Sequence, residues 1–334
     1  MPKLKFISIV LLIIILASTF LMGCEKNDTK TLKLIEVTHS VFYAPQYVAI
    51  TKGFFEEEGL KIELINGKGA DKCMTAILSG EADIGFMGPE ATIYVYNQNK
   101  EDYAVNFAQL TQKDGSFLVG REEDPNFTFD KLKGKSLLGG RKGGMPEMTL
   151  EYVLKKHGLQ PGVDLEVRTD IQFDMMAGAF TGGEGDYVTL FEPVASQLEK
   201  EGRGYIVASI GKEGGYIPYT CYSAKKSYID KNPEIIQSFT NAIYKGMLWV
   251  HSHSVEEIAD ALQPHFIETE REILIKLVER YKEQDTWKPD PVLTEEGLNH
   301  MMDIMELAGE LDQRADYNKV VTTEFAKKAM ENIK

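Results

Sequence analysis

The sequence predicts an α/β protein built from two units, the second inserted between the first and a helical tail. Between residues 32 and 120, short apolar strand patterns alternate with helical patterns. A polar breaker at residues 121–125 interrupts this alternation, which then restarts and continues to residue 210. From Pro233 onward the pattern is mostly helical. Because strands that alternate with helices form parallel βαβ units, we expect two open sheets, one in each unit.

The first unit combines period-two strand patterns with helices that start at proline and stop at glycine. Pro45 is placed to open a helix that continues through Phe55, and Gly59 is placed to end it. Two further helices carry Met74 to Leu78 and Glu90 to Tyr96. The expected strands cover residues 32–37, 60–64, 83–86, 103–110 and 116–120.

The second unit repeats the alternation, and the tail follows it. Pro146 begins a helix that Gly158 closes, another helix ends at Gly182, and Pro193 starts a third. The expected strands cover residues 136–139, 165–167, 186–191, 205–210 and 219–223. The expected tail helices cover residues 233–251, 255–262, 269–282 and 294–308.

This order predicts two lobes joined by two chain crossings. We assign residues 32–118 and 222–334 to lobe I, and residues 119–221 to lobe II. The crossings are expected near residues 117–118 and 219–222. Two adjacent crossing strands form a natural hinge.

The first residues predict export. Lys3 and Lys5 precede an uncharged apolar run over residues 6–20, and the pair Gly23-Cys24 follows. A basic start, an apolar segment and a small residue before the cut are typical of a signal peptide. The ending resembles a bacterial lipobox, which predicts a signal peptide at residues 1–23 and a lipid on Cys24. A transmembrane anchor is the alternative, and both interpretations place the rest of the chain outside the cytoplasmic membrane.

Composition narrows the possible partners. The chain of 334 residues has a formal net charge of −14, which argues against nucleic acid and against electrostatic binding to anionic lipid. We therefore expect acylation to hold the protein at the membrane, with residues 24–31 as a tether. Apart from Cys24 there are only Cys73 and Cys221, which we expect to be buried thiols rather than a structural disulfide.

The sequence lacks a convincing catalytic constellation but offers ligand-binding loops. It contains no Gly-x-Ser-x-Gly elbow and no His-Glu-x-x-His pair, and we predict neither a metal site nor a cofactor. Open α/β sheets bind ligands at the carboxyl ends of their strands. Loops rich in glycine and polar residues are placed there, at residues 39–43, 67–71, 87–90 and 141–147. Together they predict a cleft between the lobes.

Two motifs carry a family resemblance. Residues 44–49 (APQYVA) and 52–60 (KGFFEEEGL) resemble the opening of the extracellular solute-binding proteins of ABC importers. The subgroup is the one that includes sulfonate, taurine, nitrate and thiamine-pyrimidine binders. Residues 78–85, 114–119 and 132–135 extend the similarity, which spans essentially residues 31–330.

The resemblance implies a type II periplasmic-binding-protein fold that closes on a small solute. It also implies a monomer that docks on a membrane permease driven by a cytoplasmic ATPase. The same superfamily contains a eukaryotic enzyme that makes the thiamine pyrimidine from its own histidine. That histidine falls at Tyr43 here and its cysteine-rich iron motif has no counterpart, so an enzyme is disfavoured. A ligand-sensing module of a membrane kinase is a further alternative, although this chain contains no signalling partner.

The ligand class rests on the charges at the loops. Glu90 and Glu192 would repel an anion but suit the N–H groups of a nitrogen heterocycle such as an aminopyrimidine. The resemblance adds that pyrimidine binders of this subgroup use a carboxylate near Glu192. The alternative is a sulfonate- or nitrate-type anion held by Lys68, Arg141 and helix N-termini. The predicted ligand-binding residues are Ser40, Phe42, Tyr43, Gly67, Lys68, Gly69, Gly88, Glu90, Asp114, Gly144, Met145, Phe173, Glu192 and Tyr219.

Overall fold

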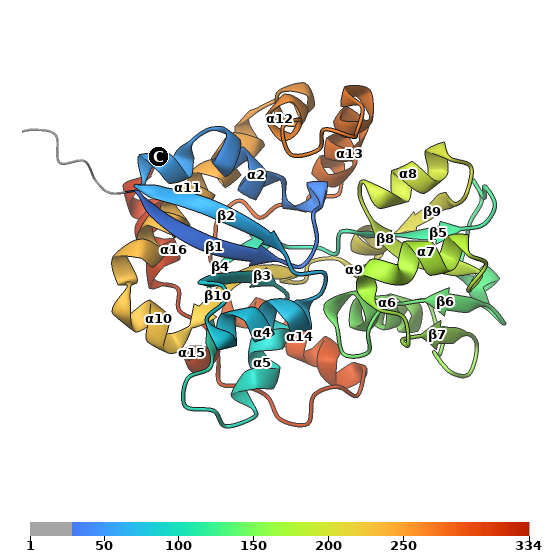
Figure 1. Ribbon diagram of the computed structural model, residues 1–334. Helices are drawn as coiled ribbons and strands as arrows, with labels where there is room; N and C mark the ends of the chain where they lie inside the picture. The colour runs from blue at the N-terminus through green and yellow to red at the C-terminus, as the bar shows by residue number, and fades with distance from the viewer. Residues whose placement is uncertain (1–28, 334) are drawn as a thin grey trace, which may run out of the picture.

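Two α/β lobes lie side by side in the computed structural model, which describes residues 29–333 (Figure 1). Each lobe is built on one five-stranded sheet. The predicted signal peptide (1–23), the lipidation site Cys24 and most of the predicted tether lie outside the described residues. The first strand begins at Lys30, two residues before the expected start of lobe I.

The sheet of lobe I has the strand order β2-β1-β3-β10-β4. Strands β1, β2 and β3 are parallel, whereas β10 runs antiparallel to both β3 and β4. Its strands are β1 (Lys30–Glu36), β2 (Leu60–Asn66), β3 (Ile84–Met87), β4 (Ala104–Thr111) and β10 (Thr220–Lys225). Its connecting helices are α2 (Ala44–Thr51), α3 (Phe54–Glu57), α4 (Ala70–Ser79) and α5 (Glu90–Tyr96), with a short 3₁₀ turn η1 (Val41–Tyr43) before α2.

The helix expected to run from Pro45 through Phe55 is two helices. Gly53 adopts a left-handed backbone conformation (φ 75°), which ends the α2 segment and starts α3 in a new direction. Phe55 is therefore buried by α3 rather than by a continuation of α2.

The sheet of lobe II has the strand order β7-β6-β8-β5-β9. Strand β6 is parallel to β7 and β8, and β5 is antiparallel to β8 and β9. Its strands are β5 (Ser116–Gly120), β6 (Ser136–Leu138), β7 (Glu166–Arg168), β8 (Tyr187–Phe191) and β9 (Tyr205–Ser209). Its helices and turns are η2 (Phe129–Leu132), α6 (Met145–Lys156), η3 (Phe173–Met175), α7 (Met176–Thr181), α8 (Val194–Lys200) and α9 (Ile210–Gly214).

The chain crosses between the lobes at residues 112–115 and 215–219. The expected first crossing at residues 117–118 lies inside β5, a strand of the lobe II sheet, because β5 pairs along its whole length with β8. The two crossing segments lie against each other. The Ile217 N–H donates to the Gln112 carbonyl at 2.8 Å, and the Tyr219 N–H donates to the Thr111 carbonyl at 3.2 Å. In place of the expected hinge of two adjacent strands, the structure has two crossing segments joined by these hydrogen bonds.

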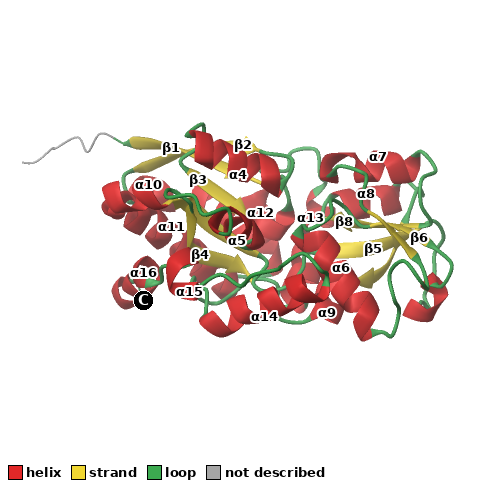
Figure 2. Cartoon of the chain, turned by 90° about the horizontal axis from the view of Figure 1, so that it is seen from below, coloured by secondary structure: helices red, strands yellow, loops and turns green. Residues whose placement is uncertain are grey.

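The C-terminal helices cover lobe I and reach across to lobe II. Helix α11 packs on α2, α3 and α16, and α12 packs on α2 and α13. Helices α13 and α14 lie at the junction of the lobes (Figure 2), where α14 contacts α6. The tail helices are α10 (Lys226–Lys231), α11 (Pro233–Ser252), α12 (Val255–Leu262), α13 (Arg271–Glu283), α14 (Glu295–Leu307), α15 (Tyr317–Val320) and α16 (Glu324–Asn332).

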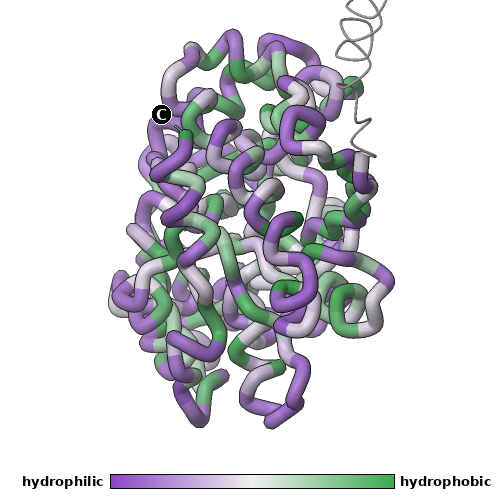
Figure 3. The backbone as a smooth tube through the Cα atoms, turned by 90° about the vertical axis from the view of Figure 1, so that its left-hand side faces the viewer, coloured by the Kyte–Doolittle hydropathy of each residue, from purple (hydrophilic) through white to green (hydrophobic). Residues whose placement is uncertain are grey.

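Hydropathy alternates along the described chain, with short hydrophobic and hydrophilic stretches following one another (Figure 3). None of the helices between residues 29 and 333 is long and apolar enough to cross a membrane. Cys73 and Cys221 are free, buried thiols, as expected. Cys221 lies in β10 of the lobe I sheet rather than in lobe II, to which residues 119–221 were assigned.

Candidate ligand-binding cleft

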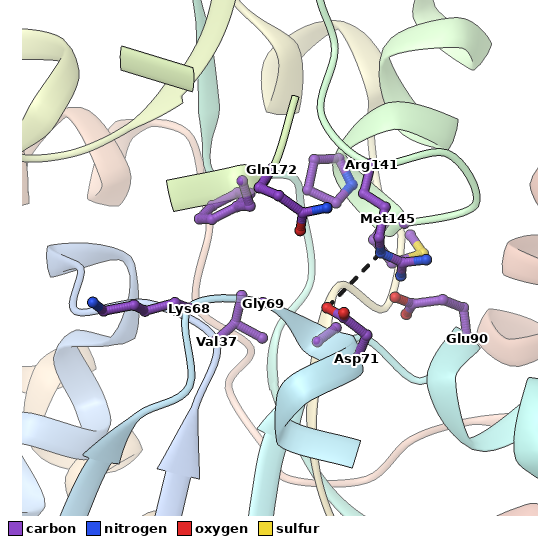
Figure 4. Close-up of a pocket in the computed structure, with 12 residues that line it drawn as sticks. Val37, Lys68, Gly69, Asp71, Glu90, Arg141, Met145 and Gln172 are labelled. Carbon is purple, nitrogen blue, oxygen red and sulfur yellow. Dashed lines mark ion pairs between the residues drawn. The ribbon is translucent and has the colours of Figure 1, made fainter. Parts of the chain in front are cut away.

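A pocket lies between the lobes at the carboxyl ends of their parallel strands (Figure 4). It has about 420 Å³ of empty volume, part of which is open solvent. The loops after β1, β2 and β3 supply its lobe I wall, and the loops after β6 and β7 supply its lobe II wall. Its lining residues are Val37, Lys68, Gly69, Ala70, Asp71, Glu90, Arg141, Gly144, Met145, Pro146, Gln172 and Phe173.

Glu90 is the buried carboxylate of this pocket. It stands at the first residue of α5 with 1% of its surface exposed, and its Oε2 atom has no hydrogen-bond partner. Burial raises the pKa of Glu90 to about 7, although the Arg141 charge and the Met145 backbone N–H oppose this rise. A buried polar atom without a partner is rare in folded proteins, so this oxygen is a place for a ligand donor.

Arg141 spans the two walls of the pocket. It extends from the loop after β6 toward lobe I, where its Nε atom lies 3.9 Å from Asp71 Oδ1 (Figure 4). Figure 4 also shows Lys68 pointing away from Glu90, on the opposite side of the pocket. The pocket therefore presents an unpaired carboxylate oxygen at one end and a lysine at the other.

A second chamber continues the cleft past Lys68 and Phe173, which line both cavities. It has about 1040 Å³ of empty volume, again partly open to solvent. Lobe I contributes Thr38, His39, Ser40, Asn66 and Lys68 to its lining, and lobe II contributes segments 173–177, 189–192 and Val194.

His39 sits at the lobe I rim of this chamber. Its Nδ1 lies 3.0 Å from Glu36 Oε1, and its Nε2 lies 2.9 Å from the His265 carbonyl. Burial works to lower the pKa of His39, but its hydrogen bonds to Glu36 and to the His265 carbonyl raise it overall. The pKa of Glu36 is raised as well, because this carboxylate is buried.

The Glu192 carboxylate is hydrogen-bonded within the protein. Its Oε1 accepts from Arg280 of α13 and from the Ser196 hydroxyl, and its Oε2 accepts from the Ser196 N–H at 2.9 Å. Burial raises the pKa of Glu192, with Arg280 acting against this rise. Both oxygens therefore already have partners. Glu192 nonetheless lines the second chamber, and its contact with a ligand stays a prediction.

The predicted aromatic contacts divide between core and cleft. Phe42 and Tyr43 are buried, and the Phe42 ring packs against Phe191 at 5.4 Å and against Tyr219 at 5.6 Å between centroids. Of the four aromatic residues among the predicted ligand-binding residues, Phe173 alone lines both the described pocket and the adjoining chamber. The other three form the floor beneath the cleft, which is a packing role.

Asp114 lies in the first crossing segment rather than in the pocket wall. Its Oδ1 accepts from the Ser116 N–H at 2.6 Å, while its Oδ2 and the nearby Tyr219 hydroxyl have no hydrogen-bond partner. Burial raises the pKa of Asp114 to about 6. A polar pair of this kind belongs to the hinge under the cleft.

The predicted glycines hold the walls close together. Gly69 and Gly144 line the pocket, whereas Gly67 lies in the turn before it. Gly88 packs behind Glu90: a Cβ atom at this position would lie 2.0 Å from Glu90 Oε2 and 2.7 Å from Met145 Cγ of lobe II. Only glycine therefore fits where the lobes meet at this point.

Direct contacts hold the lobes together in the structure. Ser40 Oγ donates to the Glu192 carbonyl, and Tyr94 OH donates to the Gly143 carbonyl at 2.9 Å. Tyr281 OH of α13 donates to the Gly115 carbonyl at 2.8 Å, which ties the tail to the hinge. These hydrogen bonds join the two lobes beside the cleft.

Sequence reasoning missed two residues that matter here. Gln172 lines the pocket from the loop after β7, and the rule that ligands bind at the carboxyl ends of strands would have found it. Arg280 lies on a tail helix far along the chain from Glu192. Nothing local in the sequence signals that pairing.

The fold and the cleft define a two-lobed solute-binding architecture, and comparison with known proteins agrees. The nitrate-binding protein NrtA of Synechocystis PCC 6803, a periplasmic protein, superposes with a TM-score of 0.74 at 17% identity, covering 92% of this chain and 90% of its own. Since the identity is low, this likeness shows the fold alone.

Sequence comparison identifies the family. The profile described as NMT1/THI5 like matches residues 41–257, and the chain belongs to this family. YtlA of Bacillus subtilis (strain 168), which is described as a binding protein, is 48% identical over 93% of this chain and 95% of its own length. The 4-amino-5-hydroxymethyl-2-methylpyrimidine phosphate synthase of Aspergillus parasiticus is more distant, 24% identical over 63% of each chain.

Proposed function

We propose that the protein is the solute receptor of an ABC importer, anchored outside the cytoplasmic membrane by a lipid on Cys24. In this role it closes on a nitrogen heterocycle, such as a thiamine-precursor pyrimidine, and delivers it to the permease. The family, the similarity to a described binding protein and the two-lobed fold support the receptor role.

The observation that favours a nitrogen heterocycle is the Oε2 atom of Glu90, which is buried without a hydrogen-bond partner. A closed cleft holds its ligand through contacts with both lobes, and differential affinity for the closed state drives closure. An amino or ring N–H group of a heterocycle would donate to Glu90, and Phe173 is placed to contact the ring. An oxyanion in the same place would face this carboxylate and be repelled.

A sulfonate- or nitrate-type anion is the second candidate, because Arg141 and Lys68 line the same pocket. Arg141, however, already faces Asp71 and Glu90, which reduces its availability for an anion. An enzymatic role has less support, since no cysteine-rich iron motif occurs in the sequence.

Calorimetric titration tests the ligand class. We expect 4-amino-5-hydroxymethyl-2-methylpyrimidine to bind the purified protein at pH 8, and nitrate and methanesulfonate not to bind. Glu90→Gln should weaken pyrimidine binding about tenfold or more, because a charge-assisted hydrogen bond is lost. The matched control Glu63→Gln changes an exposed carboxylate of β2 outside the pocket and should bind normally. Tight binding of an anion and none of the pyrimidine would reject the heterocycle.

Metabolic labelling with a radioactive fatty acid tests the anchor. We expect incorporation into the wild-type protein in membranes of its bacterial host and none into Cys24→Ala. An unlabelled wild type that still sediments with membranes would favour the uncleaved transmembrane segment instead.

A further inference from the structure

The cleft differs in charge from one end to the other. At one end is the Oε2 atom of Glu90, buried and without a partner. At the other end the lining passes through Lys68 into the second chamber, whose lobe I side carries His39 and Asn66. Figure 4 shows Lys68 and Glu90 on opposite sides of the first pocket, with the Glu90 carboxylate directed into the pocket and the Lys68 side chain directed away from Glu90.

Every acidic residue around the second chamber has a basic partner. Asp174 lies 4.0 Å from Lys72, and Glu192 is paired with Arg280. Glu36, beneath the rim, contacts His39 at 3.0 Å. By contrast, the Lys68 ammonium has neither an ion pair nor a hydrogen bond to any residue between 29 and 333. The net excess of charge on this side of the cleft is therefore positive.

The backbone fixes Lys68 at this position. It adopts a left-handed conformation (φ 58°), which non-glycine residues rarely take. The Asn66 side chain accepts from the Lys68 N–H at 3.1 Å, and the Gly69 N–H donates to the Val37 carbonyl at 3.0 Å. This turn holds the lysine at the boundary between the two cavities, where a ligand that fills both would pass it.

We infer, resting on the proposed function, that the solute is a nitrogen heterocycle carrying an anionic substituent. Its N–H groups face Glu90 in the first pocket, and its carboxylate, phosphate or sulfonate group faces Lys68 at the entrance to the second chamber. Lys68 thus selects the charged form of the ligand, and Glu90 selects the ring.

Two isosteric probes separate ring recognition from charge recognition. 2-Aminopyrimidine-5-carboxylate and 2-aminopyrimidine-5-carboxamide share ring and size, carry their two substituents at opposite ends of the ring, and differ in charge. We expect the purified full chain to bind the carboxylate about tenfold more tightly than the amide at pH 8, as one charge-assisted contact provides. Lys68→Gln should reduce that ratio to about threefold or less, while Lys61→Gln, an equal charge change on β2 outside both cavities, should preserve it.

The outcomes are distinct. Equal binding of both probes by the wild type, or tighter binding of the amide, would overturn the inference and leave the heterocycle receptor standing. A carboxylate preference that survives in Lys68→Gln would also overturn it, because another residue would then select the charge. Binding of neither probe, nor of the hydroxymethyl pyrimidine, would reject the proposed function, and the inference with it.

Discussion

Replacing Glu90 with glutamine should change the pH dependence of stability in a direction that the structure fixes. The pKa of Glu90 rises from 4.5 to about 7 in the folded protein because the carboxyl group is buried. A raised pKa means that this group favours the folded state while protonated. Its contribution is therefore complete below pH 4.5 and is lost as the pH rises through about 7.

The size of the effect follows from the same shift. The difference between 4.5 and about 7 corresponds to about 3 kcal/mol of unfolding free energy, at about 1.4 kcal/mol per pH unit. Glutamine has nearly the same shape but does not ionise. The cost of burying its amide is independent of pH, so it cancels when one compares the same variant at two pH values.

Urea unfolding of the ligand-free protein at pH 5 and pH 8 measures this difference. The unfolding free energy of Glu90→Gln minus that of the wild type should rise by about 3 kcal/mol between the two pH values. Glu63→Gln, whose carboxylate is exposed on β2, should show no such rise. A flat difference for Glu90→Gln would show that the carboxylate is well solvated, and the argument for a ligand donor at this oxygen would fail.

Three further predictions concern closure and protonation. Arg280→Met removes the cation beside buried Glu192. Breaking such a pair costs up to about 3–5 kcal/mol, less here because Arg280 is partly exposed. We expect X-ray scattering without ligand to give a larger radius of gyration, whereas an unchanged radius would exclude this pair from closure. Gly88→Ala places a Cβ atom 2.0 Å from Glu90 Oε2 and 2.7 Å from Met145 Cγ of the other lobe. Solute affinity should fall about tenfold or more, and full affinity would contradict this. Hydrogen bonds to Glu36 and to the His265 carbonyl raise the pKa of His39, so an NMR titration should give this ring a pKa above 6.5, and a lower value would be the opposite result.

The sequence was sufficient for the architecture where local patterns decide the outcome. Alternating strands, a proline at a helix start and a glycine at its end are local signals, and they located the strands of both sheets and the main tail helices. The lobe to which each strand belongs was harder to predict from the sequence. Strand β5 looks like a continuation of lobe I in sequence, yet it pairs with β8 and β9, and pairing depends on contacts between distant segments.

The sequence predicted which loops form the candidate site, because this also depends on local patterns. The loop rule brought Lys68, Glu90 and Met145 to one pocket, because parallel strands end at a common edge. It could not tell a free carboxylate from an engaged one. Glu90 and Glu192 occupy equivalent places in the pattern, but Glu192 is engaged by Ser196 of the following helix and by Arg280 of a distant one.

That difference between the two carboxylates explains how binding of a solute in the cleft favours closure of the two lobes. The Arg280–Glu192 pair and the Ser40 and Tyr94 hydrogen bonds join the lobes without any ligand, so on their own they would close an empty cleft. Glu90 opposes them where closing over an empty pocket leaves its buried carboxylate without a partner. A solute that donates to Glu90 removes that cost in the closed form alone. This differential affinity shifts the balance of open and closed forms, which lets a permease distinguish a loaded receptor from an empty one.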